Sequence, residues 1–288
     1  MNEINKLAKL LLKQNGFDPR SLTTVQIKDR DFPGKVYDVY LVSTDKERFV
    51  IKKTQEKEII VYEDYFKDKG FKIVDFYDKN IQDQEQATWV LMDYYSNENI
   101  GNKSGTVLFK VAKAICDIHI HYWNEEIVTY KYRELLEFYN EEPDIQNALL
   151  QAIKNYEACP TTLTHDDLLP INVLCKGDEV RIIDWCHAKR APYFQDLARL
   201  IAHLDGHNKN WFAEEDISLL LEEYYKLLTD SGIPLDKQQY QADIQSGILL
   251  QLAVSQSKMG NTVIGNQYLN KMKSLAQTMQ NTKCNRNC

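Results

Sequence analysis

The chain has 288 residues, of which 43% are hydrophobic and 27% are charged, and its formal net charge at pH 7 is −7. These values describe an ordinary globular protein with room for two lobes or one large domain, and they exclude disordered and collagen-like classes. The acidic balance argues against a nucleic-acid partner, because phosphate binding depends on a basic surface. No apolar run approaches the roughly 18 to 20 residues that span a bilayer, so no membrane partner is expected.

The N-terminal segment and the cysteines favour a cytoplasmic soluble protein. Residues 2–14 have the apolar spacing of an amphipathic helix broken by lysines, without the uninterrupted apolar core of a signal peptide. The six cysteines show no C-x-x-C spacing, so neither a zinc site nor a disulfide framework is expected. The sequence leaves the oligomeric state open between monomer and dimer.

The first third of the chain predicts strands on both sides of one helix. After the helix at 2–14, alternating or apolar patterns and the turns between them predict strands at 36–43 and 48–53, a helix at 56–69, and strands at 72–77 and 88–95. The polar, glycine-containing stretch 96–105 is the natural lobe boundary. We therefore expect an N-terminal lobe of residues 1–95 and a C-terminal lobe of residues 96–288, with a hinge at about 92–105.

The remaining two thirds predict a mainly helical lobe that contains one β-hairpin. Helical spacing of apolar residues predicts helices at 106–123, 130–140, 143–156, 195–207, 214–231, 235–258 and 267–279. Between them, residues 173–175 and 180–183 have strand character and flank the turn Lys176-Gly177-Asp178.

The stretch from His165 to Asn172, followed by Asp184, carries the chemistry of a magnesium-dependent phosphoryl transfer. Asp167 can accept a proton from an attacking hydroxyl, while Asn172 and Asp184 offer the oxygen ligands that Mg²⁺ prefers. The predicted hairpin would hold Asn172 and Asp184 near each other at its open end. Acidic loops with His and Asn are common, and it is Leu163 before the motif and the strand-like residues 173–175 and 180–183 after it that favour the catalytic interpretation.

The spacing His-x-Asp-x4-Asn is that of the protein-kinase catalytic loop, but Asp184 is followed by Trp185-Cys186 and no Ala-Pro-Glu segment comes later. Together with Ile183-Asp184-Trp185 and Asp196-Leu197-Ala198, the motifs instead resemble the aminoglycoside phosphotransferase and choline kinase family, the small-molecule branch of the kinase-like fold. The resemblance covers most of the chain. It implies an α+β fold with a small N-terminal lobe on an antiparallel sheet and a larger, mainly helical C-terminal lobe.

This resemblance implies a role for each motif residue. Asp167 is the implied catalytic base, and His165 supports its loop without reacting. Asn172 and Asp184 are the implied magnesium ligands, and Asp196 braces the catalytic loop from the start of a helix. Two positions depart from the common pattern: Asp166 stands where Gly is usual, and Cys186 where Glu commonly follows Asp-Trp.

The resemblance also implies an ATP or GTP site in the N-terminal lobe. Residues 49–52 resemble the strand that presents a phosphate-binding lysine, which makes Lys52 the candidate for the α- and β-phosphates. Lys53 should face the other way, because neighbours on a strand point to opposite faces. Glu58 is the expected ion-pair partner of Lys52, with Glu63 as the runner-up.

A loop and a hinge complete the predicted nucleotide site. Gly34 is the single glycine of the loop 30–37, where it permits one close approach of the backbone to the phosphates. The end of the last predicted strand is the expected hinge, where backbone groups would bind the adenine: Met92, Asp93 and Tyr94.

The family places the acceptor beside the helices that follow the metal-binding Asp, and five side chains there are candidates: Asp205, Trp211, Glu214, Glu215 and Asp216. Carboxylates hold ammonium groups and aromatic faces attract alkylated cations, which favours an aminoglycoside or a similar cationic acceptor. Acidic residues at a helix start equally favour the helix dipole. Choline, ethanolamine, homoserine and sugars stay open as acceptors, and so does a catalytically silent nucleotide-binding scaffold.

Overall fold

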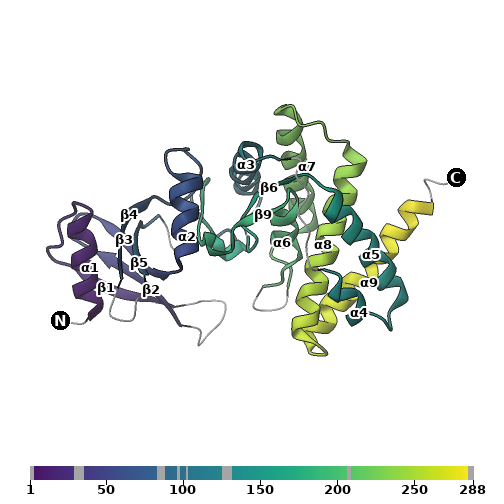
Figure 1. Ribbon diagram of the computed structural model, residues 1–288, viewed down its shortest axis with the longest axis horizontal. Coiled ribbons are helices and arrows are strands. Elements are labelled where there is room, and N and C mark those ends of the chain that lie inside the picture. Colours follow the sequence, from purple (N-terminus) through teal and green to yellow (C-terminus); the bar gives the residue numbers. More distant parts are fainter. Residues whose placement is uncertain are drawn as a thin grey trace. The chain divides into compact units, whose positions relative to one another are not determined.

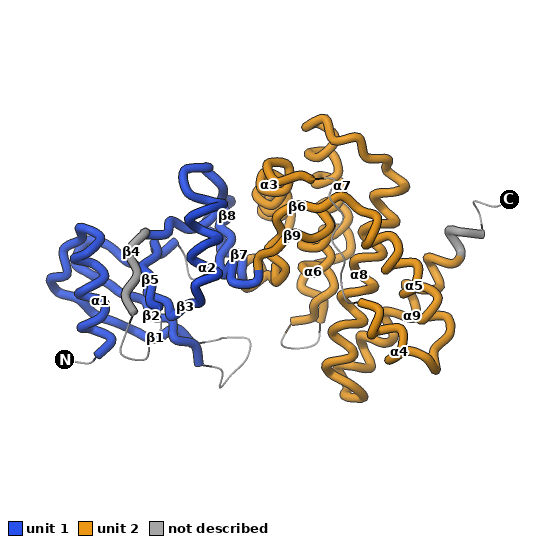
Figure 2. The backbone as a smooth tube through the Cα atoms, viewed as in Figure 1, with its two compact units in different colours: residues 1–99, 172–187 blue, residues 100–171, 188–288 orange. Residues whose placement is uncertain are grey.

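The computed structural model describes residues 3–28, 36–82, 88–95, 98–101, 103–124, 132–205 and 209–284. The chain forms two compact units, one of residues 1–99 with 172–187 and one of residues 100–171 with 188–288 (Figure 2). The lobe boundary near residue 95 stays a prediction. The compact units differ from it chiefly in the segment 172–187, which packs with the N-terminal residues.

The first unit is built on a five-stranded antiparallel sheet in the order β1-β2-β3-β5-β4 (Figure 1). Its strands are β1 Thr23–Lys28, β2 Val36–Ser43, β3 Arg48–Thr54, β4 Phe76–Gln82 and β5 Thr88–Asp93. The sequence pattern did not predict β1, and it placed β4 four residues too early. β1 lies at the sheet edge and leaves Val25 and Ile27 exposed, so its apolar positions do not mark a buried face.

The helix α1, Glu3–Gln14, covers one face of this sheet and agrees with the predicted amphipathic helix. Its apolar stripe (Ala8, Leu11 and Leu12) is fully buried against side chains of the three central strands. Spacings of three and four residues place these side chains on one helix face. Burial of that face ties the helix to the strand that carries Lys52.

The helix predicted at 56–69 is shorter and consists of two parts. The α-helix α2 spans Glu56–Ile60, and a π-helical turn, Val61–Phe66, continues it. Glu58, Tyr62 and Phe66 all lie on its buried side. π-Helical turns are rare, and they occur frequently at functional sites.

The predicted hairpin is formed by β7, Val173–Lys176, and β8, Glu179–Ile182, which pair antiparallel. Gly177 adopts the left-handed conformation of the turn, with φ 59°. The Ile182 N–H donates to the Lys72 carbonyl at 2.9 Å, and the Cys175 N–H donates to the Glu98 carbonyl at 2.9 Å. These backbone bonds explain why 172–187 belongs to the first compact unit.

The second unit is mainly helical and surrounds a short antiparallel strand pair (Figure 1). The strands are β6 Thr161–Thr164 and β9 Lys189–Pro192. The helices are α3 Thr106–His121, α4 Glu134–Phe138, α5 Pro143–Ala158, α6 Gln195–Ala202, α7 Glu214–Asp230, α8 Lys237–Met259 and α9 Val263–Cys284. The two strands were not predicted, and α6 ends five residues earlier than expected.

The helix α8 approaches α6 closely at Gly247. A Cβ at Gly247 would lie 2.5 Å from Phe194 Cδ2 and 2.8 Å from Ala198 Cβ. Only glycine fits there without a shift of the neighbouring side chains. In the described part of the chain, no helix combines the length and apolar character needed to cross a membrane.

Candidate active site

Lys52 lies within a charged cluster of the first unit. Its Nζ donates to both carboxylate oxygens of Glu58, at 2.9 and 2.8 Å, and to Asp184 Oδ1 at 2.6 Å. The expected ion pair between Lys52 and Glu58 is therefore formed. Lys53 comes within 4.0 Å of Asp38 instead, as the alternation of side chains along β3 requires.

The burial of Glu58 strengthens its ion pair with Lys52. Glu58 is 1% exposed and also accepts a hydrogen bond from the Thr54 hydroxyl, whereas the runner-up Glu63 is exposed. Burial lowers the pKa of Lys52, but the charges of Glu58 and Asp184 raise it more, so the pKa lies above its ordinary value. Lys52 is therefore a fixed cation at neutral pH.

Asp184 follows β8 in a left-handed backbone conformation, with φ 68°. The next residue, Trp185, is 1% exposed and packs on Phe66 of the π-helical turn, with ring centroids 4.5 Å apart. Non-glycine residues adopt this conformation at a cost, and the buried indole compensates for it by anchoring the turn. Burial, followed by the charge of Asp184, raises the pKa of Cys186 to about 12, so a neutral thiol stands where the family commonly has a carboxylate.

Asn172 immediately precedes β7, and its carbonyl accepts a hydrogen bond from the Ile183 N–H at 3.0 Å. This bond brings the backbone of Asn172 next to Asp184 at the open end of the hairpin, as predicted. One carboxylate and one amide oxygen suit Mg²⁺, which keeps several waters and binds few protein ligands. The donor set therefore fits magnesium, and within the described residues no group of three His, Cys, Asp or Glu side chains offers an alternative site.

The predicted hinge residues lie at the end of β5. The N–H groups of Asp93 and Tyr94 donate to the carbonyls of Asp75, at 3.0 Å, and Arg48, at 3.4 Å. Met92 is buried. Adenine recognition by this segment stays a prediction, and it needs backbone groups other than these two donors. Gly34 lies outside the described residues.

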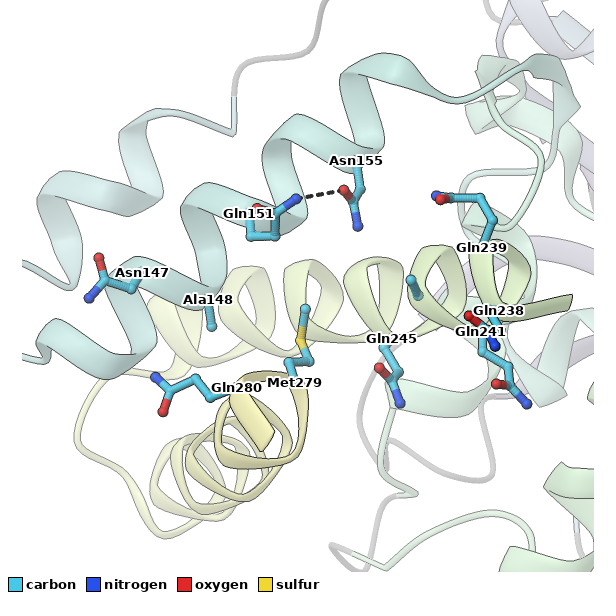
Figure 3. A pocket seen from close by; sticks show the side chains of 11 residues that line it. Asn147, Ala148, Gln151, Asn155, Gln238, Gln239, Gln241, Gln245, Met279 and Gln280 are labelled. Atoms are coloured by element: carbon cyan, nitrogen blue, oxygen red, sulfur yellow. Dashed lines mark hydrogen bonds between the residues drawn. The ribbon is translucent and has the colours of Figure 1, made fainter. Parts of the chain in front are cut away.

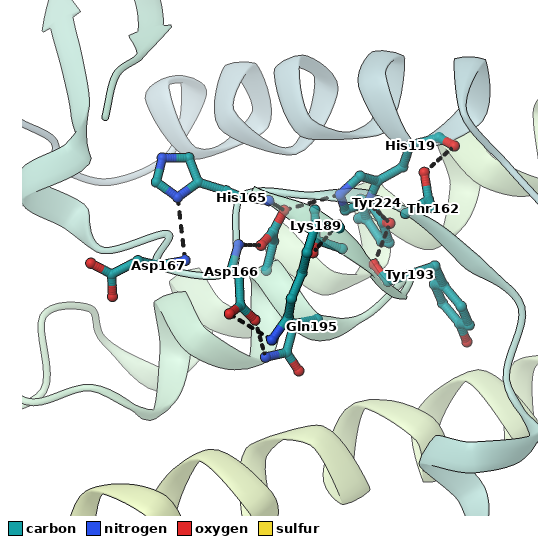
Figure 4. Close-up of polar contacts among 11 residues, drawn as sticks. His119, Thr162, His165, Asp166, Asp167, Lys189, Tyr193, Gln195 and Tyr224 are labelled. Carbon is teal, nitrogen blue, oxygen red and sulfur yellow. Dashed lines mark hydrogen bonds and ion pairs between the residues drawn. The ribbon is translucent and has the colours of Figure 1, made fainter. Parts of the chain in front are cut away.

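The loop that carries Asp167 belongs to the second unit and follows β6. Its backbone is held by Asp196 at the start of α6, whose carboxylate accepts hydrogen bonds from the His165 N–H at 2.8 Å and the Asp166 N–H at 3.0 Å. His165 is completely buried, and its Nδ1 lies 3.3 Å from the Asp167 nitrogen (Figure 4). Asp196 thus holds the backbone of the loop, and the supporting roles that the family resemblance implies for Asp196 and His165 stay predictions.

A buried histidine completes the support of Asp196. His119 Nε2 lies 3.1 Å from Asp196 Oδ2, and His119 Nδ1 lies 2.5 Å from the Tyr224 hydroxyl (Figure 4). Burial would raise the pKa of Asp196, but the hydrogen bond and charge of His119, with those of His165, lower it below the ordinary value. Asp196 is therefore an ionised buried carboxylate that fixes the loop.

Asp167 forms an ion pair that the sequence pattern did not predict. Arg199 on α6 donates to Asp167 Oδ1 through Nη2 at 2.8 Å and Nε at 3.2 Å. Arg199 lies three residues after Asp196, and residues three apart share a helix face. That spacing is the signal that could have placed Arg199 beside the loop.

Asp166 also has partners from distant parts of the sequence. Its backbone has φ 63°, and its carboxylate contacts Lys189 Nζ at 2.7 Å and accepts from Gln195 Nε2 at 2.9 Å (Figure 4). Neither Lys189 nor Gln195 was singled out from the sequence. Lys189 lies on β9, a strand without an alternating pattern, so nothing local pointed to it.

The acidic residues predicted to bind the acceptor either accept backbone hydrogen bonds or are exposed, and their binding role stays a prediction. Asp216 Oδ1 accepts from the Gly105 N–H at 3.3 Å, and Asp205 Oδ1 accepts from the Lys209 N–H at 2.7 Å. Glu214 and Glu215 are exposed in the first turn of α7. Trp211 is partly buried, and its Nε1 is buried without a hydrogen-bond partner in the described part of the chain.

A pocket of about 380 Å³ lies among α5, α8 and α9 (Figure 3). Eight of the eleven side chains that line it are amides, including Asn155, Gln239 and Gln245. None of the candidate residues above is among them. This pocket is therefore separate from the motif residues that carry the chemistry.

Residues 32–226, more than half of the chain, match the phosphotransferase enzyme family. The chain belongs to this family. Among curated proteins, none gives a significant match to the chain.

Solved structures show the same fold at low identity. Choline kinase LicA from Streptococcus pneumoniae is 15% identical, with a TM-score of 0.60 over 96% of this chain and 100% of that one. The choline kinase of Cryptosporidium parvum Iowa II is 12% identical, with a TM-score of 0.60 over 96% and 95%. The spectinomycin phosphotransferase APH(9)-Ia, in complex with ADP and spectinomycin, is 17% identical, with a TM-score of 0.57 over 94% and 93%. The predicted kinase-like α+β fold is confirmed.

Proposed function

We propose that this protein transfers the γ-phosphate of ATP or GTP to a hydroxyl group of a small molecule. The observation that carries the proposal is the position of Lys52 Nζ, within hydrogen-bond distance of both Glu58 and Asp184. A lysine fixed by a buried glutamate and placed beside a candidate metal ligand suits the binding of nucleotide phosphates. Family membership and the kinase-like fold support the same reaction class.

Each proposed residue has one task. Lys52 binds the α- and β-phosphates, and Glu58 keeps its ammonium group in place. Asn172 and Asp184 hold Mg²⁺, which supplies positive charge over the phosphate oxygens when it is bound. Asp167 accepts the proton of the acceptor hydroxyl as that oxygen bonds to the γ-phosphorus and the bond to the leaving nucleoside diphosphate breaks.

The nucleotide is proposed from chemistry and from similar proteins. LicA has been solved with AMP and APH(9)-Ia with ADP, and both are similar to this chain over more than nine tenths of its length. Adenine nucleotides are therefore the first ligands to test, with GTP beside ATP.

The acceptor is proposed as a small molecule with a free hydroxyl. The names of the similar structures include choline kinases and aminoglycoside phosphotransferases, which supports the predicted cationic acceptor. The carboxylates of Asp205 and Asp216 accept backbone hydrogen bonds, and this placement gives the cationic class little support. The observation that bears most closely on the acceptor is the pair of Asp167 with Arg199.

The test is a mass-spectrometric screen for phosphorylated products with Mg-ATP and Mg-GTP. Pools of aminoglycosides, amino alcohols, hydroxy acids and sugars are offered to the wild type, to Asp167→Ala and to the control Asp230→Ala, which changes an exposed aspartate at the end of α7. We expect product from the wild type and the control, and none from Asp167→Ala. Equal turnover by Asp167→Ala would refute its role as the base. Nucleotide binding without any product would favour the silent scaffold.

A further inference from the structure

Arg199 contacts the candidate base with only one edge of its guanidinium group. Nε and Nη2 both donate to Asp167 Oδ1, and the Arg199 and Asp167 side chains are 18% and 30% exposed. Within the described residues, Arg199 Nη1 makes no hydrogen bond. The edge formed by Nη1 and Nη2 has the fork geometry that binds a carboxylate through two parallel bonds.

His203 follows Arg199 by one helical turn and is electrostatically coupled to the same pair. Burial, followed by the charge of Arg199, lowers the pKa of His203 to about 4; the charge of Asp167 opposes this shift and that of Lys258 adds to it. The ring is therefore neutral at pH 7. Its Nδ1 is buried and has no hydrogen-bond partner among the residues that the structure describes.

Trp211 lies next to His203 through the backbone. Leu204 and Asn210 form an antiparallel bridge. His203 precedes Leu204 and Trp211 follows Asn210, so the backbones of these two residues lie opposite each other beside the bridge. Trp211 Nε1 is buried and, like His203 Nδ1, lacks a partner in the described ranges. An indole nitrogen is only a donor, so a carboxylate oxygen is a suitable partner for it.

Arg199 places positive charge and a second donor edge beside the candidate base, and His203, at the C-terminal end of the same helix, feels the charges of both residues. An acceptor molecule must place its hydroxyl against Asp167, and hence next to Arg199. An ammonium group at that position would face a like charge and would find no further carboxylate among the groups just described. A carboxylate, in contrast, accepts two hydrogen bonds from the guanidinium edge, and it stabilises the positive charge.

We propose that Arg199, with His203 and Trp211, recognises a carboxylate that the acceptor carries near the hydroxyl to be phosphorylated. The acceptor is then a hydroxy acid and not a purely cationic amine. This inference rests on the proposed function, because it takes Asp167 as the base of the transfer.

The test compares acceptors that differ only in the carboxylate. Glycerate with glycerol and 4-hydroxybutyrate with 1,4-butanediol form matched pairs, and choline, ethanolamine and kanamycin represent the cations. The variants are Arg199→Met and the control Arg133→Met, which removes an exposed arginine paired with Glu157. Product formation gives kcat and KM for each acceptor, and calorimetry gives hydroxy-acid binding without turnover.

We expect the wild type to prefer the hydroxy acids, and we expect Arg199→Met to reduce that preference by about 10²-fold, mainly through KM. Arg133→Met should leave the ratio unchanged. A merely structural role for Arg199 would lower the rates with both members of a pair equally. That result, or turnover confined to cationic acceptors, would overturn the inference while the proposed function stands.

Measurement of hydroxy-acid binding distinguishes failure of the carboxylate inference from failure of the proposed function. Hydroxy-acid binding that is lost in Arg199→Met, without product from any pool, would support the carboxylate site and refute the proposed transfer. Absence of hydroxy-acid binding and of hydroxy-acid product would overturn the inference whatever other product forms.

Discussion

His203 makes the stability of the protein sensitive to mild acid. Its pKa of about 4 in the folded state lies below the ordinary value of 6.5, because the ring is buried and Arg199 is near. Between these two values the unfolded chain binds a proton that the folded chain does not, so stability falls as the pH falls. The full difference corresponds to about 3 kcal/mol, and about 2 kcal/mol of it is lost between pH 7 and pH 5.

Two measurements test this effect. Histidine NMR follows the six imidazole groups, and the resonance that titrates near pH 4 should be absent from His203→Gln. Urea unfolding at pH 7 and pH 5 should show that the wild type loses about 2 kcal/mol more than His203→Gln over this range. Comparison with the variant cancels the contributions of all other titrating groups.

A variant of Arg199 tests whether its charge contributes to the lowered pKa of His203. Its charge is the second contribution to the lowered pKa of His203, after burial. In Arg199→Met the pKa of His203 should rise toward its ordinary value, and less stability should be lost in acid. A wild-type protein whose pH dependence equals that of His203→Gln would refute this reasoning.

Two further predictions concern the nucleotide site and the packing of the second unit. Glu58→Gln should weaken Mg-ATP binding by about tenfold, measured by calorimetry against the exposed control Glu63→Gln, because it removes the buried charge that fixes Lys52; unchanged affinity would contradict that role. Gly247→Ala should lower stability by about 1 to 3 kcal/mol in thermal unfolding, since the new Cβ would overlap Phe194. Helix propensity alone predicts a gain of about 1 kcal/mol, so a more stable variant would refute the packing argument.

The sequence predicted the elements whose patterns are long or repeated. The amphipathic stripe of α1, the hairpin around Gly177 and the long C-terminal helices follow from apolar spacing and turn chemistry. The strands β6 and β9 could not be predicted, because residues 165–188 separate them, so no turn joins them and each strand is defined by pairing with the other. The π-helical turn likewise depends on tertiary packing.

The candidate site likewise contains residues that local sequence patterns do not predict. The predicted hairpin placed Asn172 beside Asp184, and the family resemblance favoured Lys52, with strand alternation sending Lys53 to the other face. Arg199 and Lys189 set the charge around the loop of Asp167, and each follows its partner carboxylate by more than twenty residues in the sequence. Only the three-dimensional structure brings these cations to the carboxylates.

The two adjacent acids of the loop explain how the departure at Asp166 is accommodated. The position needs a left-handed backbone, which favours glycine and which aspartate tolerates better than most residues. A second carboxylate next to Asp167 introduces like-charge repulsion, and each acid has its own cation: Lys189 from β9 for Asp166 and Arg199 from α6 for Asp167. The two ion pairs offset this repulsion, and Asp167 keeps its proposed role as the base. The same pairing places a guanidinium group beside the proposed hydroxyl, so the unusual aspartate and the proposed preference for an acid acceptor belong to one charge arrangement.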